Sequence, residues 1–246
     1  MKYGWKRDLP DQRDHVYSLA LSAGTLPDSV DLRPQCPVVY NQGRLGSCTA
    51  NALGSMIEFL EIKEKLNDQY TPSRLFIYYY ERLIEHTIGY DAGAALRDGM
   101  KVLVNLGAPH ENLWPYNISL FKETPPIACY NDALNHKVVQ YQRLTQDLNS
   151  LKSCLADGFP FAFGFTVYQN FEATDIAQNG IMHMPSGGTL GGHAVKAVGY
   201  DESKQWFIVK NSWGVQWGDK GYFYMPYQYI TNSHLASDFW TAKMVK

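Results

Sequence analysis

The sequence has no long hydrophobic run, and this excludes a membrane span. No window approaches the roughly 18 uninterrupted apolar residues that a spanning helix needs. The charged opening MKYGWKRDLPDQRD has no apolar run behind it of the kind that a secretory signal carries. We therefore expect a soluble protein without a membrane partner. Its compartment stays open: secreted or host-directed if a signal was removed, and cytoplasmic otherwise.

The sequence also lacks an excess of positive or negative charge. The 246 residues include 22 Lys+Arg and 24 Asp+Glu, with a formal net charge of −2, and the basic residues are scattered along the chain. Nucleic acids and anionic membranes are usually bound through clustered basic residues, so neither is expected as a partner. With 45% hydrophobic residues the composition is that of a globular protein and excludes disorder as the main state.

Cysteine is scarce, with Cys36, Cys48, Cys129 and Cys154 in the whole chain. Four cysteines are too few for a disulfide-built scaffold of this length, and their spacing matches no zinc pattern. If one of them is a working thiol, the other three cannot all pair with one another. We expect neither a metal nor an organic cofactor, and the redox state of the remaining cysteines stays open.

The chain divides into three stretches of different character. Residues 1–27 are polar and are interpreted as a leader or pro-like segment, and residues 28–246 as one domain. Within it we expect a helical half over about 28–128 and a β-rich half over about 129–240, an α+β arrangement with a cleft between the halves. We expect no internal repeat.

Hydrophobic periodicity predicts three helices in the first half. Apolar residues recur at helical spacing from Cys48 to Lys65, where the first regular element is expected to begin. A second helix is predicted with Thr71 as its cap and Pro72 at its first position, and Leu83 on its apolar face. The third runs over about 94–106 and stops at Gly107.

Short runs rich in β-branched and aromatic residues follow after about residue 158. They are FPFAFGFTVY, HAVKAVGY, QWFIVKNSW and GYFYM, each bounded by glycine or other turn residues. Such runs are typical of strands. The second half is therefore predicted to be a sheet.

Cys48 is placed where a thiol can be activated. A helix N-terminus stabilises a thiolate through its unpaired N–H groups and its dipole, and Gly46 with Ser47 allows a tight turn that exposes the sulfur. Most free cysteines are only small buried hydrophobes. The position alone therefore leaves both interpretations open.

Four further motifs decide between them. The stretch from Asn41 to Cys48, NQGRLGSC, resembles the nucleophile motif of the papain family of cysteine peptidases. Gly192-His193-Ala194-Val195 and Val198-Gly199-Tyr200-Asp201 are similar to the histidine strand of that family. Lys210-Asn211-Ser212-Trp213-Gly214 is similar to its asparagine motif, and the order Cys, His, Asn also fits.

The resemblance implies a papain-like fold, with a helical domain, a β-barrel-like domain and the active site in the cleft between them. It implies a cysteine peptidase in which Cys48 is the nucleophile and His193 its base. Asn211 would orient His193, and the Gln42 side chain would donate to the oxyanion. Trp213 would shield the His193–Asn211 pair.

The implied substrate groove is formed mainly by small residues. Gly93 and Ala94 occupy the place of a Gly-Gly pair whose backbone binds the substrate strand. Gly191 and Gly192 would leave an open wall on the subsite that selects a substrate side chain, and Trp213 is counted with the same surface. A glycine-rich hinge is the structural alternative.

The chain departs from the family pattern in its short leader and in Leu45, which replaces a disulfide cysteine. Short leaders are found in bacterial members, and a large-virus source is equally open. We expect a monomeric endopeptidase that takes peptide or protein substrates, with residues 1–26 as an intramolecular inhibitor or as a strap that only stabilises the fold. A papain-fold acyl transferase and a catalytically silent peptide-binding protein remain as alternatives.

Overall fold

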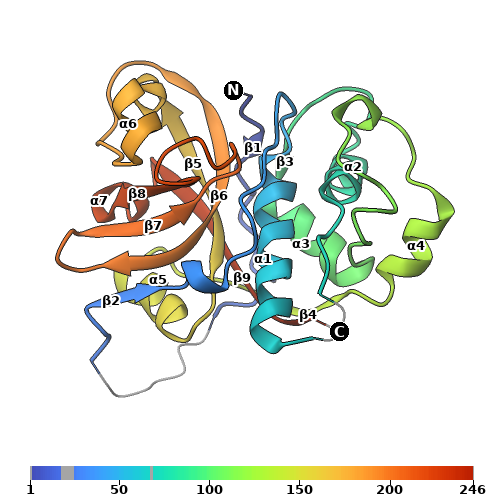
Figure 1. The fold of residues 1–246 in the computed structure, drawn as a ribbon, viewed down its shortest axis with the longest axis horizontal. Coiled ribbons are helices and arrows are strands. Elements are labelled where there is room, and N and C mark those ends of the chain that lie inside the picture. The colour runs from blue at the N-terminus through green and yellow to red at the C-terminus, as the bar shows by residue number, and fades with distance from the viewer. Residues whose placement is uncertain (1, 18–24, 67–68, 246) are drawn as a thin grey trace.

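The structure is a computed structural model, and it describes residues 2–17, 25–66 and 69–245. The prediction for the leader therefore lies partly outside the described residues. Figure 1 shows a helical half and a sheet half side by side, with helix α1 (Cys48–Glu64) running along the boundary between them. The predicted α+β class is confirmed.

The central position of α1 explains its composition. Most of its side chains are buried, including Leu53, Met56 and Ile57. One side of the helix packs on the other helices and the opposite side on the sheet. A helix that is covered on both sides is hydrophobic nearly all round. The other helices of this half are α2 (Arg74–Ile84), α3 (Leu96–Asn105) and α4 (Ile127–Ala133).

Two details of the predicted helices are wrong. The cap of α2 is Ser73 rather than Thr71, because the Ser73 hydroxyl accepts a hydrogen bond from the Phe76 N–H while Pro72 forms an isolated bridge with His110. Leu83 is 40% exposed and lies outside the core. Cys48 is not the start of the first regular element either, because the strands Trp5–Lys6 and Ser29–Asp31 and a 3-10 turn at Arg33–Gln35 precede it.

The second half is built on one antiparallel sheet. Its strand order is β4-β9-β5-β6-β7-β8, and β2 pairs with β6 beside this path. The sheet is open, with β4 and β8 at the ends of the order, so the predicted barrel-like form is a curved sheet rather than a closed barrel. The strands are β2 (Ser29–Asp31), β4 (Val138–Arg143), β5 (Phe161–Tyr168), β6 (Thr189–Asp201), β7 (Trp206–Lys210), β8 (Tyr222–Pro226) and β9 (Ala236–Val245).

Aromatic side chains fill the sheet side of the core. Phe163 stacks on Phe239 with ring centroids 5.5 Å apart, and Phe161 and Phe165 flank this pair. This half also has three short helices: α5 (Leu148–Ala156) and α7 (Tyr227–Ile230), which pack on the sheet, and α6 (Thr174–Asn179), which packs on the 3-10 turn Gln169–Glu172. Within the described residues, no helix has both the length and the apolar character to cross a membrane.

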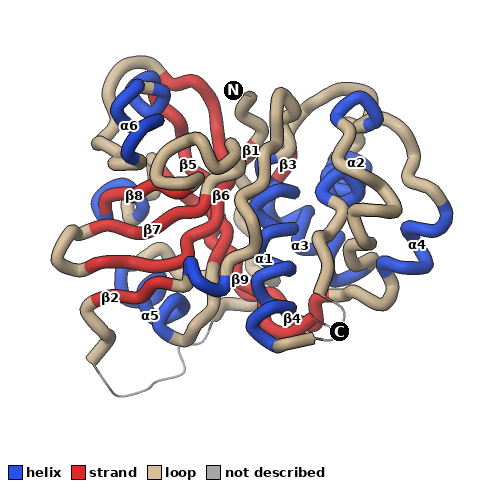
Figure 2. Tube along the Cα trace, in the orientation of Figure 1, coloured by secondary structure: helices blue, strands red, loops and turns tan. Residues whose placement is uncertain are grey.

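The N-terminal segment lies along the boundary between the halves. Strand β1 (Trp5–Lys6) pairs in parallel with β3 (Ala94–Ala95) of the helical half, and it also packs on β6 of the sheet. Figure 2 shows this segment passing beside α1. Further along the leader, the Tyr17 N–H donates to the Arg143 carbonyl, which ties the segment to β4.

Candidate active site

Cys48 is the first residue of α1 and is fully buried. The turn before it is held from the helical half, since the Asp91 carboxylate accepts the Gly46 N–H at 3.1 Å and also bonds the Tyr78 hydroxyl. The Ser47 carbonyl then accepts the first helical hydrogen bond from Asn51. These contacts fix the sulfur at the N-terminus of the helix.

His193 lies on β6 and faces the same boundary. The β6–β7 pairing places the residue after β7, Asn211, beside it, and Asn211 Oδ1 lies 2.8 Å from His193 Nε2. Because the amide oxygen is an acceptor, Nε2 carries the proton of the neutral ring and Nδ1 is left with the lone pair. Nδ1 is buried and has no hydrogen bond to any described residue.

Trp213 covers this pair. Its ring stacks on His193, with centroids 4.9 Å apart and planes at 25°. The Ser212 N–H donates to Asn211 Oδ1 at 2.8 Å, so the same oxygen accepts from both sides. The amide orientation of Asn211 is therefore fixed, and with it the orientation of the His193 ring.

Cys48 and His193 are brought together by the backbone of β6. Ala194, the neighbour of His193, hydrogen-bonds the Cys48 sulfur through its backbone, as does Gly4 of the leader. Burial nevertheless raises the pKa of the Cys48 thiol to about 11, and burial lowers the pKa of His193 to about 4. In this state the thiol and the imidazole are both neutral.

Gln42 is oriented by a serine that the sequence analysis did not single out. The Ser212 hydroxyl donates to Gln42 Oε1 at 2.7 Å, so Nε2 points away from Ser212. Nε2 then donates to the Leu45 carbonyl at 3.0 Å and to the Lys2 carbonyl at 3.3 Å. The signal for Ser212 was its position inside the Asn-Ser-Trp-Gly motif, whereas Asp91 carried no comparable signal.

The leader contacts both walls on which the substrate groove is predicted. On the helical side, Ala94 N–H donates to the Gly4 carbonyl at 2.7 Å, and Gly93 (φ +72°) passes so close that a Cβ there would lie 2.0 Å from the same oxygen. On the sheet side, a Cβ at Gly192 would lie 2.5 Å from the Trp5 carbonyl. Side chains larger than glycine would displace the leader from both positions.

Gly191 and Trp213 contact Tyr3 of the leader. A Cβ on Gly191 would lie 2.9 Å from the Tyr3 Cβ, and the rings of Tyr3 and Trp213 have centroids 6.1 Å apart. The Tyr3 hydroxyl also donates to Glu172 at 2.5 Å. All five predicted groove residues thus meet the leader.

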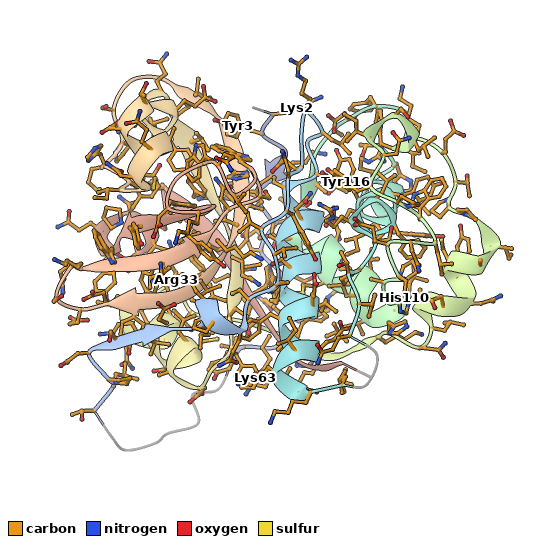
Figure 3. All side chains as sticks on the ribbon, viewed as in Figure 1. Lys2, Tyr3, Arg33, Lys63, His110 and Tyr116 are labelled. Atoms are coloured by element: carbon orange, nitrogen blue, oxygen red, sulfur yellow. The ribbon has the colours of Figure 1, made fainter. Side chains whose placement is uncertain are left out.

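Charged groups hold the leader at both ends of this stretch. Lys2 forms an ion pair with Asp91, and Lys6 pairs with Glu85 at 2.7 Å. Figure 3 shows Lys2 and Tyr3 at the boundary between the two halves. Further along, the Trp240 Nε1–H and the Arg97 N–H donate to the Asp8 carboxylate, whose pKa is raised by burial to about 6.

The chain is similar to known proteases over nearly its whole length. A family model described as papain family cysteine protease matches residues 26–242. An uncharacterized peptidase C1-like protein of Acanthamoeba polyphaga mimivirus is 40% identical, with 99% of this chain and 87% of the relative covered. A cathepsin B-like protein of Giardia intestinalis is 31% identical, with 82% of this chain and 70% of the relative covered.

The solved structures agree with the sequence comparison. The crystal structure of xylellain, a cysteine protease from Xylella fastidiosa, is 45% identical with a TM-score of 0.94, covering 99% of this chain and 96% of that one. This bears out the predicted resemblance to bacterial members of the family and the papain-like fold. The chain belongs to the papain family of cysteine proteases.

Proposed function

We propose that residues 28–246 form a cysteine endopeptidase domain in which Cys48, His193, Asn211 and Gln42 carry the reaction. The observation that carries this assignment is the His193–Asn211 hydrogen bond of 2.8 Å under the stacked Trp213 ring, beside a thiol at a helix N-terminus. A nucleophile, a base and a group that orients the base are thus present at one site, as covalent catalysis needs. Family membership supports the same chemistry.

In the working state the Cys48 thiolate attacks the scissile carbonyl carbon, and His193 holds the proton at Nδ1. The tetrahedral oxyanion accepts hydrogen bonds from Gln42 Nε2 and from the Cys48 N–H, each contributing about 3 kcal/mol. His193 gives its proton to the leaving amine, and the thioester forms. Water then attacks the thioester, with His193 as the base, and the carboxylate product leaves.

The leader inhibits this site by occupying it. Its Gly4 backbone hydrogen-bonds the sulfur and its Lys2 carbonyl takes the Gln42 donor. With the sulfur and the oxyanion donor both in contact with the leader backbone, a substrate carbonyl has no access to either group. A tethered segment needs little intrinsic affinity, because its effective concentration can be millimolar.

Substrate is proposed to take the place of the leader. Gly93 and Ala94 would bind the substrate backbone, and Gly191, Gly192 and Trp213 would line the side-chain subsites that Tyr3 and Trp5 contact. The described leader runs past the sulfur in both directions, from Lys2 to Lys6. A chain that continues on both sides of the reacting bond is an endopeptidase substrate, and we propose a monomer as the active unit.

The test is labelling and cleavage by matched thiol variants. When the leader leaves the cleft, an epoxide probe should label the full chain once, which mass spectrometry measures. The protein should also hydrolyse members of a peptide library. Cys48→Ala should lose both, whereas Cys154→Ala, which removes another fully buried thiol, should keep both. Residual activity of Cys48→Ala above about a hundredth of the parent would contradict the assignment.

The same assay separates the alternatives. An acyl transferase would give amide products when an amine is added, at the expense of hydrolysis. A silent peptide-binding protein would bind peptides without taking the probe.

A further inference from the structure

Three side chains that commonly bind metals meet in the helical half, remote from Cys48. His110 Nδ1 lies 2.9 Å from Asp132 Oδ2, and His136 Nε2 lies 3.9 Å from Asp132 Oδ1. One ligand atom from each residue can be chosen so that all three lie within 4.8 Å of one another. Two imidazoles and one carboxylate thus converge on one point.

The backbone holds these groups in place from two separate segments. Asp132 lies on α4 and His136 one turn beyond it, whereas His110 comes from the segment that follows α3. The His110 N–H donates to Asp132 Oδ2 at 2.8 Å, and the Ala108 N–H donates to the His136 carbonyl at 3.3 Å. The two segments are therefore already joined at the positions where the ligands stand.

Tyr70 fixes the two imidazole rings. Its ring centroid lies 4.3 Å from that of His110 and 4.3 Å from that of His136. The Tyr70 hydroxyl donates to the Ala108 carbonyl at 2.6 Å, which anchors the tyrosine to the same segment. Groups that orient metal ligands in this way strengthen binding, because less order has to be imposed when the ion arrives.

We propose that His110, Asp132 and His136 bind a divalent transition-metal ion, with Zn²⁺ as the best fit. Bonds of about 2.1 Å in a tetrahedral site place neighbouring ligand atoms about 3.4 Å apart. The two imidazoles lie 2.9 and 3.9 Å from the two different oxygens of Asp132, on either side of that value, and one ligand atom of each residue lies within 4.8 Å of the others. Side-chain rotations would bring the three atoms to the spacing that the ion requires. His110 and Asp132 are only partly buried, which leaves room for water as a fourth ligand.

The ion would act on stability rather than on peptide hydrolysis. It would clamp α4 to the segment after α3, and Figure 3 shows His110 in the helical half, well separated from Lys2 and Tyr3 at the boundary. For the ion to bind, the His110 ring keeps its proton on Nε2 and gives its Nδ1 lone pair to the metal. Asp132 binds as a carboxylate, so no oxidant or further reactant is involved.

The experiment uses the full chain with Cys48→Ala, which removes the most prominent competing thiol. After treatment with a chelator, ZnCl2 is titrated and followed by calorimetry, and a parallel CoCl2 titration is followed by visible absorption. We expect about one Zn²⁺ per chain, a raised Tm on binding, and a cobalt spectrum of nitrogen and oxygen ligands without a thiolate band.

Matched variants identify the ligands. His136→Gln and Asp132→Asn should each weaken Zn²⁺ binding at least about tenfold and abolish the Tm rise. The control is His183→Gln, because His183 also lies 3.0 Å from a carboxylate, Asp175, on the exposed surface, and its loss should change neither quantity. His136→Ala is added as a second variant if His136→Gln does not fold.

Equal Zn²⁺ affinity in the parent and in the folded variants would overturn the proposal. So would the absence of binding to the folded parent at about a hundred micromolar Zn²⁺, or a thiolate band in the cobalt spectrum. In those cases the three residues are only a hydrogen-bonded structural cluster.

Discussion

Gln42 Nε2 donates a hydrogen bond of 3.3 Å to the carbonyl oxygen of Lys2. The group proposed to bind the oxyanion thus already holds a backbone carbonyl of the leader. Since the Gly4 backbone sits at the Cys48 sulfur, two parts of the catalytic machinery are occupied by one short stretch of chain. Activity should therefore depend on how tightly residues 2–6 are held.

Trp5→Ala should raise kcat/KM at least about tenfold. The indole lies against Gly164 and Gly192, and losing the burial of a large side chain costs about 2 kcal/mol, enough to shift the leader toward release. Peptide hydrolysis is measured beside Leu9→Ala, a leader variant whose side chain is 80% exposed and which should behave like the parent. Unchanged kinetics with a lowered Tm would mean that the leader is only a strap.

Deletion of residues 2–26 gives a stronger form of the same prediction. It removes the Lys2, Lys6 and Asp8 anchors together, so activity should rise further than in Trp5→Ala while the Tm falls. Thermal melts establish that the shortened chain is folded before the rates are compared. A folded chain with no gain in kcat/KM would contradict inhibition.

The pH dependence of Cys48 alkylation should differ between the covered and the released states. With a pKa of about 11, only about a thousandth of the Cys48 thiol is ionised at pH 8 in the covered chain, so its alkylation should be slow and should rise steadily with pH. In Trp5→Ala the readmitted water should favour the thiolate–imidazolium pair, and alkylation should be fast below pH 7. Iodoacetamide kinetics with mass spectrometry of Cys48 distinguish the two. Identical profiles would show that the leader does not control ionisation.

Acidification should favour release of the leader through His193. Burial lowers the pKa of His193 to about 4 in the covered chain. Release of the leader admits water, which should bring this pKa back toward the ordinary value of about 6.5, so the released state should bind more protons between these pH values. The contribution of neutral His193 to the stability of the covered state is complete above pH 6.5 and is lost as the pH falls toward 4. Asp8, with its raised pKa, acts in the opposite sense, and so the comparison has to isolate His193.

Hydrogen exchange of residues 2–6 between pH 4 and 7 measures this effect. His193→Gln should flatten the pH dependence of leader opening, whereas His183→Gln, an exposed histidine on the sheet half, should leave it unchanged. A slope that survives in His193→Gln would assign the effect to other groups.

Gln42→Glu should lower kcat by about a hundredfold or more while changing KM little, because an oxyanion donor acts mainly in the transition state. The substitution keeps an oxygen for the Ser212 hydroxyl, removes the Nε2 donor and places a negative charge beside the developing oxyanion. Steady-state kinetics in the Trp5→Ala background avoid interference from the leader. Gln140→Glu, exposed on β4, serves as the matched control and should have the parent kcat. A parent-like kcat in Gln42→Glu would remove Gln42 from the mechanism.

Local patterns determined much of the fold. The helix beginning at Cys48 and the strands at Phe161–Tyr168, Trp206–Lys210 and Tyr222–Pro226 follow from apolar periodicity and β-branched content. Strands β4 and β9 escaped prediction for physical reasons. β4 lies at the end of the sheet and only Val138 of its six residues is buried, so it lacks an apolar alternation. β9 is interrupted by Asp238 at φ +61° next to a register shift.

For the site, the sequence by itself determined the candidate residues Cys48, His193, Asn211 and Gln42, because their motifs are short and contiguous. Only the tertiary structure decided their ionisation, since the burial that opposes an ion pair comes from segments far apart in the chain, Trp213 and Phe165 of the sheet half and Tyr3 and Gly4 of the leader among them. The same holds for His110, Asp132 and His136, which no local pattern relates. Their convergence depends on the packing of α4 against the segment after α3, and such long-range contacts are not written in any one stretch of sequence.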